Sequence, residues 1–516
     1  MRLDGHSLTL EDVLAVGTQP TTVLEVAPAA LEQVERARAQ VEAWVREEHR
    51  VIYGVTTGLG KLKDFVVRAE DQEVFQRNIL LSHAVGIGPF WEERIVRMAM
   101  VLRANVWCRA HSGVRPELLQ RLLLFVNRGL TPQVPQVGSL GVGDLQPLAH
   151  VGLCLAGMPE GVLQVGGETG SAPDMLRRAG IDPAVFPLST REALALMAGS
   201  TMLLAAAIDV YAQARHLSRL MEVALAFTLE AVRGELHAYD PRIHEARGIE
   251  SQIQTAAAVR ALVDGSEWMT PEGRAQAGER QPRVQDAVSL RSAPQIQGAM
   301  GDVLNYIESV LIREINSSTD NPLLFPTEDG YESLSGGNFH GALLAYAMDF
   351  LGIVLTDAAV LSERRSARLL DPQANFGLPA NLVGEAVGLH CGLALLQANA
   401  AALVGEMRVL ATPASIGSVP SKGNQEDHNS MGMGALRKTR QLIDHFKHVL
   451  AIELLCATQG IALLEGKMDG LRLGRGTDAL YRKIRETIPP LRQDRYVRED
   501  LDNMLELMEG DVLCTI

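Results

Sequence analysis

The chain has 516 residues, of which 47% are hydrophobic and 21% charged, the balance of a soluble globular protein with one large core or two to three smaller ones. Its net charge of −14 argues against nucleic acid as a partner, because phosphates need a basic face. No apolar run reaches the ~18 residues that span a bilayer without charged or polar interruption, and the N-terminus lacks the apolar core of a signal peptide, so we expect a cytoplasmic protein without a membrane partner.

Helical patterns dominate the first part of the chain. Apolar residues at helical spacing predict helices over residues 31–50, 71–83, 92–110 and 116–127. Residues 51–60 between the first two helices predict a short strand or extended piece that breaks into a Gly/Thr loop. This loop is either an ordinary surface loop or a lid that carries Tyr53 over a cleft, since lids need glycine hinges.

A glycine-rich loop, Gly138-Ser139-Leu140-Gly141-Val142-Gly143-Asp144, precedes an apolar segment that predicts a helix over residues 145–155. Asp144 stands at the position of an N-cap for that helix. The loop lacks the Gly-Lys-Ser/Thr ending of a P-loop and the acidic partner of a dinucleotide site. By itself the stretch therefore predicts a tight loop capped by a helix.

Long apolar segments follow from about residue 190 onward. They predict helices over residues 200–233, 303–315, 342–370, 389–411 and 434–464. Helices that are apolar on nearly every face lie inside a bundle or at a subunit interface. We therefore predict a mainly α protein with a loop-bearing helical domain over residues 1–198, then a long-helix bundle and C-terminal helices over residues 199–516.

The five cysteines are scattered along the chain, at Cys108, Cys154, Cys391, Cys456 and Cys514. Their number is odd, most lie in apolar surroundings, and none shows the spacing of metal ligands. This pattern predicts reduced core thiols in a cytoplasmic protein and no metal site.

Seven stretches in the same order and at similar intervals resemble the histidine and aromatic amino acid ammonia-lyase family, most closely its histidine branch. They start at residues 53, 81, 138, 285, 319, 335 and 423. Together they cover most of the chain. The resemblance implies the helical architecture of the fumarase/aspartase type, and homotetramers whose active sites combine several subunits.

The resemblance also implies roles for single residues. Tyr53 matches the tyrosine that removes the β-proton, and Arg291 matches the arginine that grips the substrate carboxylate. His83 lies where the family contacts the substrate side chain, and Glu426 matches the histidine branch as a second acid/base. The remaining substrate-binding candidates are Gln285 and Phe339. The structural alternatives are a packed core tyrosine, an ion pair for the arginine, a neutral hydrogen-bonded histidine, and a helix N-cap cluster around the glutamate.

The centre of the glycine-rich loop departs from the family. Between Gly141 and Asp144 the family has Ala-Ser-Gly, which condenses into methylidene-imidazolone (MIO), the electrophilic cofactor, whereas this chain has only Val142-Gly143. MIO needs a serine hydroxyl that leaves as water, and valine has no leaving group. We therefore expect a degenerate cofactor loop and no MIO.

Two more family positions are lost. Ala198 stands where the family has an asparagine that helps to hold the cofactor and substrate, and Val288 stands where it has a second catalytic tyrosine. Without MIO, elimination needs a substrate with a better leaving group, or a reaction that runs as addition or cyclisation.

Two functions therefore remain open. The first is a carbon–nitrogen lyase acting on a histidine-like amino acid or related carboxylate, with Tyr53 as base. The second is an inactive pseudoenzyme that binds a carboxylate ligand or forms mixed oligomers with an active relative.

Overall fold

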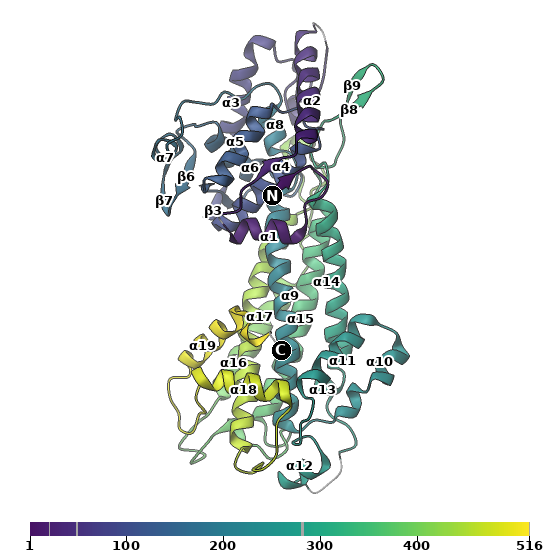
Figure 1. The fold of residues 1–516 in the computed structure, drawn as a ribbon, viewed down its shortest axis with the longest axis vertical. Coiled ribbons are helices and arrows are strands. Elements are labelled where there is room, and N and C mark those ends of the chain that lie inside the picture. The colour runs from purple at the N-terminus through teal and green to yellow at the C-terminus, as the bar shows by residue number, and fades with distance from the viewer. Residues whose placement is uncertain (20, 48–49, 280–282, 515–516) are drawn as a thin grey trace. The chain divides into compact units, whose positions relative to one another are not determined.

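The computed structural model describes residues 1–19, 21–47, 50–279 and 283–514 (Figure 1). Helices dominate it, and the strands form four small sheets of two or three strands each within these residues. This confirms the predicted mainly α fold class.

The chain groups by spatial contact into two compact units. Unit 1 comprises Met1–Asp209, Ile307–Asp349 and Pro413–Arg437, and unit 2 comprises Val210–Tyr306, Phe350–Thr412 and Lys438–Ile516. Each unit is thus assembled from three separate segments. The predicted boundary between two folding domains, between residues 198 and 199, is not tested by this grouping and stays a prediction.

Unit 1 holds a cluster of short and medium helices around α4. They are α1 (Leu10–Thr18), α2 (Pro28–Arg46), α3 (Gln72–His83), α4 (Glu93–Cys108), α5 (Pro116–Asn127), α6 (Leu145–Leu155), α7 (Ala172–Arg178) and α8 (Glu192–Met197). Every residue of α4 from Ile95 to Cys108 is buried, so this helix is the centre of the core. Proline stands in the first turn of α2, α5 and α7, where backbone N–H groups make no hydrogen bond within the helix, so the N–H that proline lacks is not needed.

The sheets of unit 1 are marginal ribbons at its loops. They pair β1 (Arg2–Leu3) with β2 (Glu25–Val26), β3 (Ile87–Phe90) with β5 (Pro135–Val137), β4 (Leu130–Pro132) with β6 (Val162–Val165) and β7 (Glu168–Ser171), and β8 (Leu323–Thr327) with β9 (Gly330–Leu334). Of the two alternatives predicted near residue 51, a short strand or an extended piece, the strand is wrong. Ile52 begins a turn instead, because the Thr56 hydroxyl accepts the Ile52 N–H at 2.9 Å and donates to the Arg50 carbonyl at 2.7 Å.

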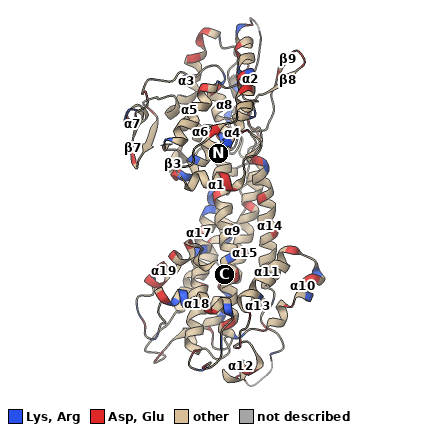
Figure 2. Cartoon of the chain, viewed as in Figure 1, with Lys and Arg blue, Asp and Glu red and all other residues tan. Residues whose placement is uncertain are grey.

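Long helices run through unit 2 or end in it. They are α9 (Thr201–Val232), α14 (Ala293–Ile315), α15 (Ala342–Leu370), α16 (Ala394–Leu410) and α17 (Gly432–Leu464). The short helices are α10 (Pro241–Arg247), α11 (Glu250–Leu262), α12 (Pro271–Gln276), α13 (Val288–Arg291), α18 (Arg475–Thr487) and α19 (Arg498–Glu509). Acidic and basic residues mix along α10 and α19, while α15 is mostly uncharged (Figure 2). The long helices confirm the predicted segments, although α14 begins ten residues before the predicted residue 303.

A buried ion pair ties three long helices together inside unit 2. Arg365 on α15 donates to Glu453 on α17 at 2.7 Å, and the Thr228 hydroxyl on α9 donates to the same carboxylate at 2.9 Å. All three side chains are fully buried. Both oxygens of Glu453 and two nitrogens of Arg365 are paired, which lowers the cost of burying charge in an apolar bundle, whereas Nη1 of Arg365 has no hydrogen-bond partner among the described residues.

Three helical stretches are long and apolar enough to cross a membrane by length and composition alone. They are Glu192–Val232, Ala342–Leu370 and Gly432–Leu464, and their most apolar windows are 100%, 61% and 78% buried within the protein. Polar or charged residues, for example Asp209 and Asp349, interrupt these stretches, so the expectation that no uninterrupted apolar run of this length exists is not contradicted, although the mean hydropathy is high. Burial inside a helical protein accounts for much of this apolar surface.

Candidate active site

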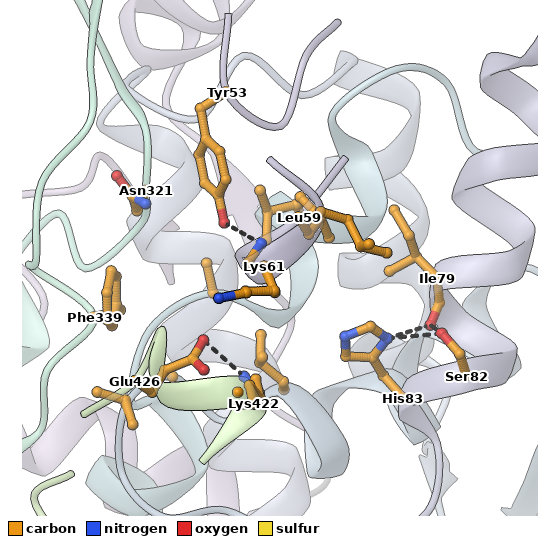
Figure 3. A pocket seen from close by; sticks show the side chains of 18 of the residues that line it. Tyr53, Leu59, Lys61, Ile79, Ser82, His83, Asn321, Phe339, Lys422 and Glu426 are labelled. Atoms are coloured by element: carbon orange, nitrogen blue, oxygen red, sulfur yellow. Dashed lines mark hydrogen bonds and ion pairs between the residues drawn. The ribbon is translucent and has the colours of Figure 1, made fainter. Parts of the chain in front are cut away.

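A cavity of about 560 Å³ lies entirely within unit 1 (Figure 3). Seven of the residues singled out from the sequence line it: Tyr53, His83, Val142, Gly143, Ala198, Phe339 and Glu426. They come from segments far apart in the chain. The structure thus brings together the candidate base Tyr53, the candidate substrate-binding and acid/base residues His83 and Glu426, and the centre of the glycine-rich loop.

Tyr53 lies on the turn that begins at Ile52. Its hydroxyl accepts the Gly60 N–H at 3.2 Å, so the turn and the following loop fix the direction of the phenol (Figure 3). The ring is half-buried and the oxygen faces the cavity. The alternative of a fully packed core tyrosine does not describe this side chain.

His83 is the last residue of α3 and is held in one tautomer. Its Nδ1 donates to the Ile79 carbonyl at 2.8 Å and lies 3.0 Å from the Ser82 hydroxyl, so Nε2 of the neutral ring is an acceptor on the cavity side (Figure 3). Burial lowers the pKa of His83, and the positive charge of Lys422 lowers it further. The ring is therefore neutral at neutral pH.

Glu426 lies in the loop before α17 with its two oxygens in different situations. Oε1 accepts from Lys422 Nζ at 3.3 Å, whereas Oε2 is buried and has no hydrogen-bond partner among the described residues. An unpaired buried carboxylate oxygen is costly unless a ligand donates to it. The helix N-cap alternative is wrong, because α17 begins only at Gly432.

The segment that carries Lys422 is strained. Lys422, Gly423 and Asn424 all have left-handed backbones, with φ of 47°, 64° and 62°. Such a conformation costs a lysine about 1–3 kcal/mol and persists only where the surroundings impose it. Lys422, Lys61 and Asn321 also line the cavity, and no sequence motif assigned a role to any of them. The Gly-Asn pair after Lys422 was the one signal of an unusual turn there.

The glycine-rich loop is held through its backbone. Gly143 N–H donates to the Phe339 carbonyl at 3.0 Å, Asp144 N–H donates to Gly199 at 2.8 Å, and the Gly141 carbonyl accepts from Gly341 at 2.9 Å. Gly141 has φ of 82°, and a Cβ there would lie 2.0 Å from the Ser430 hydroxyl. Only glycine fits this position.

Asp144 is the N-cap residue of α6, as predicted, but its side chain makes no capping hydrogen bond to that helix. Its carboxylate instead accepts the Leu203 N–H at 3.0 Å, in the first turn of α9, and the Ser139 hydroxyl at 2.8 Å. Burial raises the pKa of Asp144 to about 6, against these two hydrogen bonds, which lower it. Asp144 thus joins the loop to the start of α9, where the helix dipole favours a negative group.

The residues present do not fit MIO. Val142 presents an isopropyl group to the cavity, and the Gly143 amide, which would have to close the ring, already donates to Phe339. The nearby Ser139 is buried, and its hydroxyl donates to Asp144. No hydroxyl that can leave stands next to a free glycine amide in this loop.

Gln285 and Arg291 lie in unit 2, where they line another cavity, of about 600 Å³. Most charged groups there are paired: Arg283 donates to Glu279 at 2.8 Å and to Asp286 at 3.3 Å. Arg291 ends α13, and its Nε is buried without a hydrogen-bond partner among the described residues. The structural ion pair considered for Arg291 is therefore absent from the described part of the chain. Val288 is 56% exposed on the same short helix.

Comparison with known proteins places this fold and these residues in a class. The chain belongs to the aromatic amino acid lyase family, which it matches over residues 8–486.

Similar proteins cover nearly the whole chain. It is 43% identical to histidine ammonia-lyase of Alkaliphilus oremlandii over 508 residues, which are 98% of this chain and 96% of that protein. The crystal structure of histidine ammonia-lyase from Trypanosoma cruzi is similar with a TM-score of 0.87 at 34% identity, covering 99% of this chain and 94% of the other. Ergothionase from Treponema denticola, an ergothioneine-degrading enzyme, is similar with a TM-score of 0.91 at 27% identity, covering 100% of both chains.

Proposed function

We propose that the protein is a carbon–nitrogen lyase that eliminates an amine from a histidine-like amino acid without MIO. One observation carries the proposal: Tyr53, His83 and Glu426 line one cavity, in which Val142 takes the place of the MIO-forming serine. Membership of the lyase family and the histidine ammonia-lyase relatives support the class of reaction.

In the proposed reaction, Tyr53 as phenolate takes the β-proton of the substrate. The C–H electron pair forms the carbon–carbon double bond, the C–N bond breaks, and the amine leaves with the C–N pair. A positioned base of this kind accelerates proton transfer by about 10²–10⁴-fold. Lys61 and Lys422 line the same cavity as Tyr53.

The leaving group must be better than ammonia, and we propose a quaternary ammonium. Such a group leaves as a neutral amine and needs no electrophile to activate it. The cavity wall near the loop is apolar, which suits N-methyl groups: Val142, Leu145, Leu194, Ala198 and Phe339. The similar Treponema denticola enzyme degrades ergothioneine, a trimethylated histidine betaine that carries sulfur on its ring.

We also propose a cytoplasmic homotetramer in which active sites combine residues of several subunits, with Arg291 holding the substrate carboxylate. Arginine suits this role because its planar fork binds a carboxylate through two parallel hydrogen bonds. The unpartnered Nε of Arg291 supports the assignment. Light scattering that gives a stable monomer at micromolar concentration would contradict the assembly.

The test compares L-histidine with its Nα-trimethyl betaine as substrates of the purified full-length protein. We expect release of trimethylamine from the betaine, no ammonia from histidine, and an intact mass equal to the translated mass. A mass two waters lower, mapped to residues 138–144, would show MIO and overturn the proposal. Carboxylate binding without turnover of any betaine would favour the pseudoenzyme.

A further inference from the structure

One end of the unit 1 cavity combines two hydrogen-bond acceptors with an ammonium group. One acceptor is Nε2 of His83, because the hydrogen bond from Nδ1 to the Ile79 carbonyl fixes the tautomer of the ring. The other is Oε2 of Glu426, which has no partner among the described residues. The ammonium is that of Lys422, which lies 3.3 Å from the other Glu426 oxygen and close enough to His83 to lower its pKa (Figure 3).

These groups define what a ring bound among them must offer. Each acceptor calls for an N–H donor, so a ring with two N–H groups satisfies both His83 and Glu426. A neutral imidazole has only one N–H. An imidazolium has two, but its positive charge lies unfavourably beside Lys422. A neutral ring with two N–H groups and an exocyclic acceptor between them, an imidazole-2-thione or imidazol-2-one, matches all three.

We infer that Lys422 is a specificity residue that donates a hydrogen bond to an exocyclic sulfur or oxygen on the substrate ring. The inference rests on the proposed function, because it takes the unit 1 cavity as the substrate site. An ammonium has three N–H donors, and the contact with Glu426 uses one of them.

A purely structural ion pair with Glu426 explains the position of Lys422 less well than a role in binding the substrate ring. Lys422 is 39% exposed and its pairing with Glu426 at four residues' separation is of the kind that contributes little to stability. That pairing also leaves the second oxygen of Glu426 buried and unpartnered. A left-handed backbone at a lysine, followed by two more left-handed residues, adds cost where stability gains little.

The test measures binding of two small probes, 1,3-dihydroimidazole-2-thione and imidazole, to the full-length protein by calorimetry. We expect the wild type to prefer the thione by about 10-fold, the effect of one charge-assisted hydrogen bond. Lys422→Met, which keeps the length of the side chain, should abolish the preference, and Lys422→Arg should keep most of it. Lys63→Met is the matched control, because Lys63 pairs with Asp64 outside the cavity lining.

The inference is overturned if the wild type shows no preference for the thione, or if Lys422→Met keeps it. Neither result requires turnover, so both are independent of the elimination assay. Turnover of the trimethyl betaine together with an unchanged probe preference in Lys422→Met would leave the proposed function standing and remove this inference. If Lys422→Met loses the preference for the thione but no betaine is turned over, the inference about Lys422 stands and the proposed function fails.

Discussion

The cavities of the two units are similar in volume, about 560 Å³ and 600 Å³, but they differ in how far the polar groups that line them are paired with one another. In unit 1 the wall is mostly apolar, and the Oε2 atom of Glu426 has no partner among the described residues. In unit 2 the arginines and acids bind one another, and Arg274, for example, pairs with Glu235. The comparison indicates that unit 1 leaves groups open for chemistry, whereas the described residues of the unit 2 cavity form a paired frame beside the guanidinium of Arg291, whose Nε has no partner among them.

The strongest test of this comparison is Tyr53→Phe. The change removes one oxygen from the unit 1 cavity and leaves packing nearly unchanged, so we expect turnover of the true substrate to fall by about 10²–10⁴-fold while binding changes little. Steady-state kinetics measure both. Tyr331→Phe is the control, since Tyr331 packs on the cluster of Val41 and Trp44 instead. Wild-type turnover by Tyr53→Phe would reject the tyrosine base and make Glu426 the next candidate.

Gly141→Ala tests whether the glycine-rich loop depends on close backbone approach. The new Cβ combines a left-handed backbone with a contact of 2.0 Å to Ser430, so we expect a loss of about 2–4 kcal/mol in the free energy of unfolding. Gly129→Ala has a similar φ of 64° but no atom within 4 Å of its Cβ, and should lose only about 1 kcal/mol. Equal losses in denaturant titrations would show that strain alone, and not Ser430, restricts this position.

Arg291→Lys tests the guanidinium beside the paired frame of unit 2. Lysine keeps the charge but loses the planar fork, so carboxylate binding should weaken by about 1–3 kcal/mol in calorimetry, and Arg291→Ala should weaken it at least as much. Arg242→Lys is a suitable control because Arg242 is exposed and pairs with Asp240. If both Arg291 variants fold and bind like the wild type, Arg291 does not hold the carboxylate.

Glu230→Gln tests the buried frame of unit 2 through pH. Burial raises the pKa of Glu230 to about 7, although Gly474 N–H and the hydroxyls of Ser266 and Thr477 donate to it. The folded state therefore binds the proton more tightly than the unfolded state, so this stabilisation is complete at acid pH and is lost as pH rises through 7.

Between pH 6 and pH 8 the wild type should lose about 1 kcal/mol of unfolding free energy through Glu230, and Glu230→Gln should not. Glu222, whose pKa burial also raises to about 7, keeps its own share of the pH dependence in the variant. Denaturant titrations at the two pH values measure the difference. The same slope in both proteins would show that Glu230 does not titrate in this range.

Periodicity located the long helices well, and α15 begins and ends where the apolar pattern does. The start of α14 was missed because Gly298 and Gly301 resemble helix breakers. In the structure a Cβ at Gly298 would lie 2.6 Å from the Gln252 backbone, so this glycine permits close helix packing. A local pattern cannot show that a distant backbone occupies the space of a missing side chain.

The motifs named most of the residues around the unit 1 cavity but not how they act. The partner of the Asp144 carboxylate lies on α9, far along the sequence, and capping rules consider only the next turn. Lys422 was missed because a lone lysine in a loop has no spacing signal. The separation of Arg291 from Tyr53 into different cavities also depends on tertiary structure, which motif order does not contain.

The way in which the glycine-rich loop is fastened has a consequence for the history of the site. Peptide groups of Gly141, Gly143 and Asp144 and the carboxylate of Asp144 make the bonds that hold it, and none of these bonds depends on the side chain at position 142. The side chain at position 142 can thus be exchanged without unfastening the loop. A loop of this kind can keep its backbone conformation during evolution while the side chain that decides its chemistry changes.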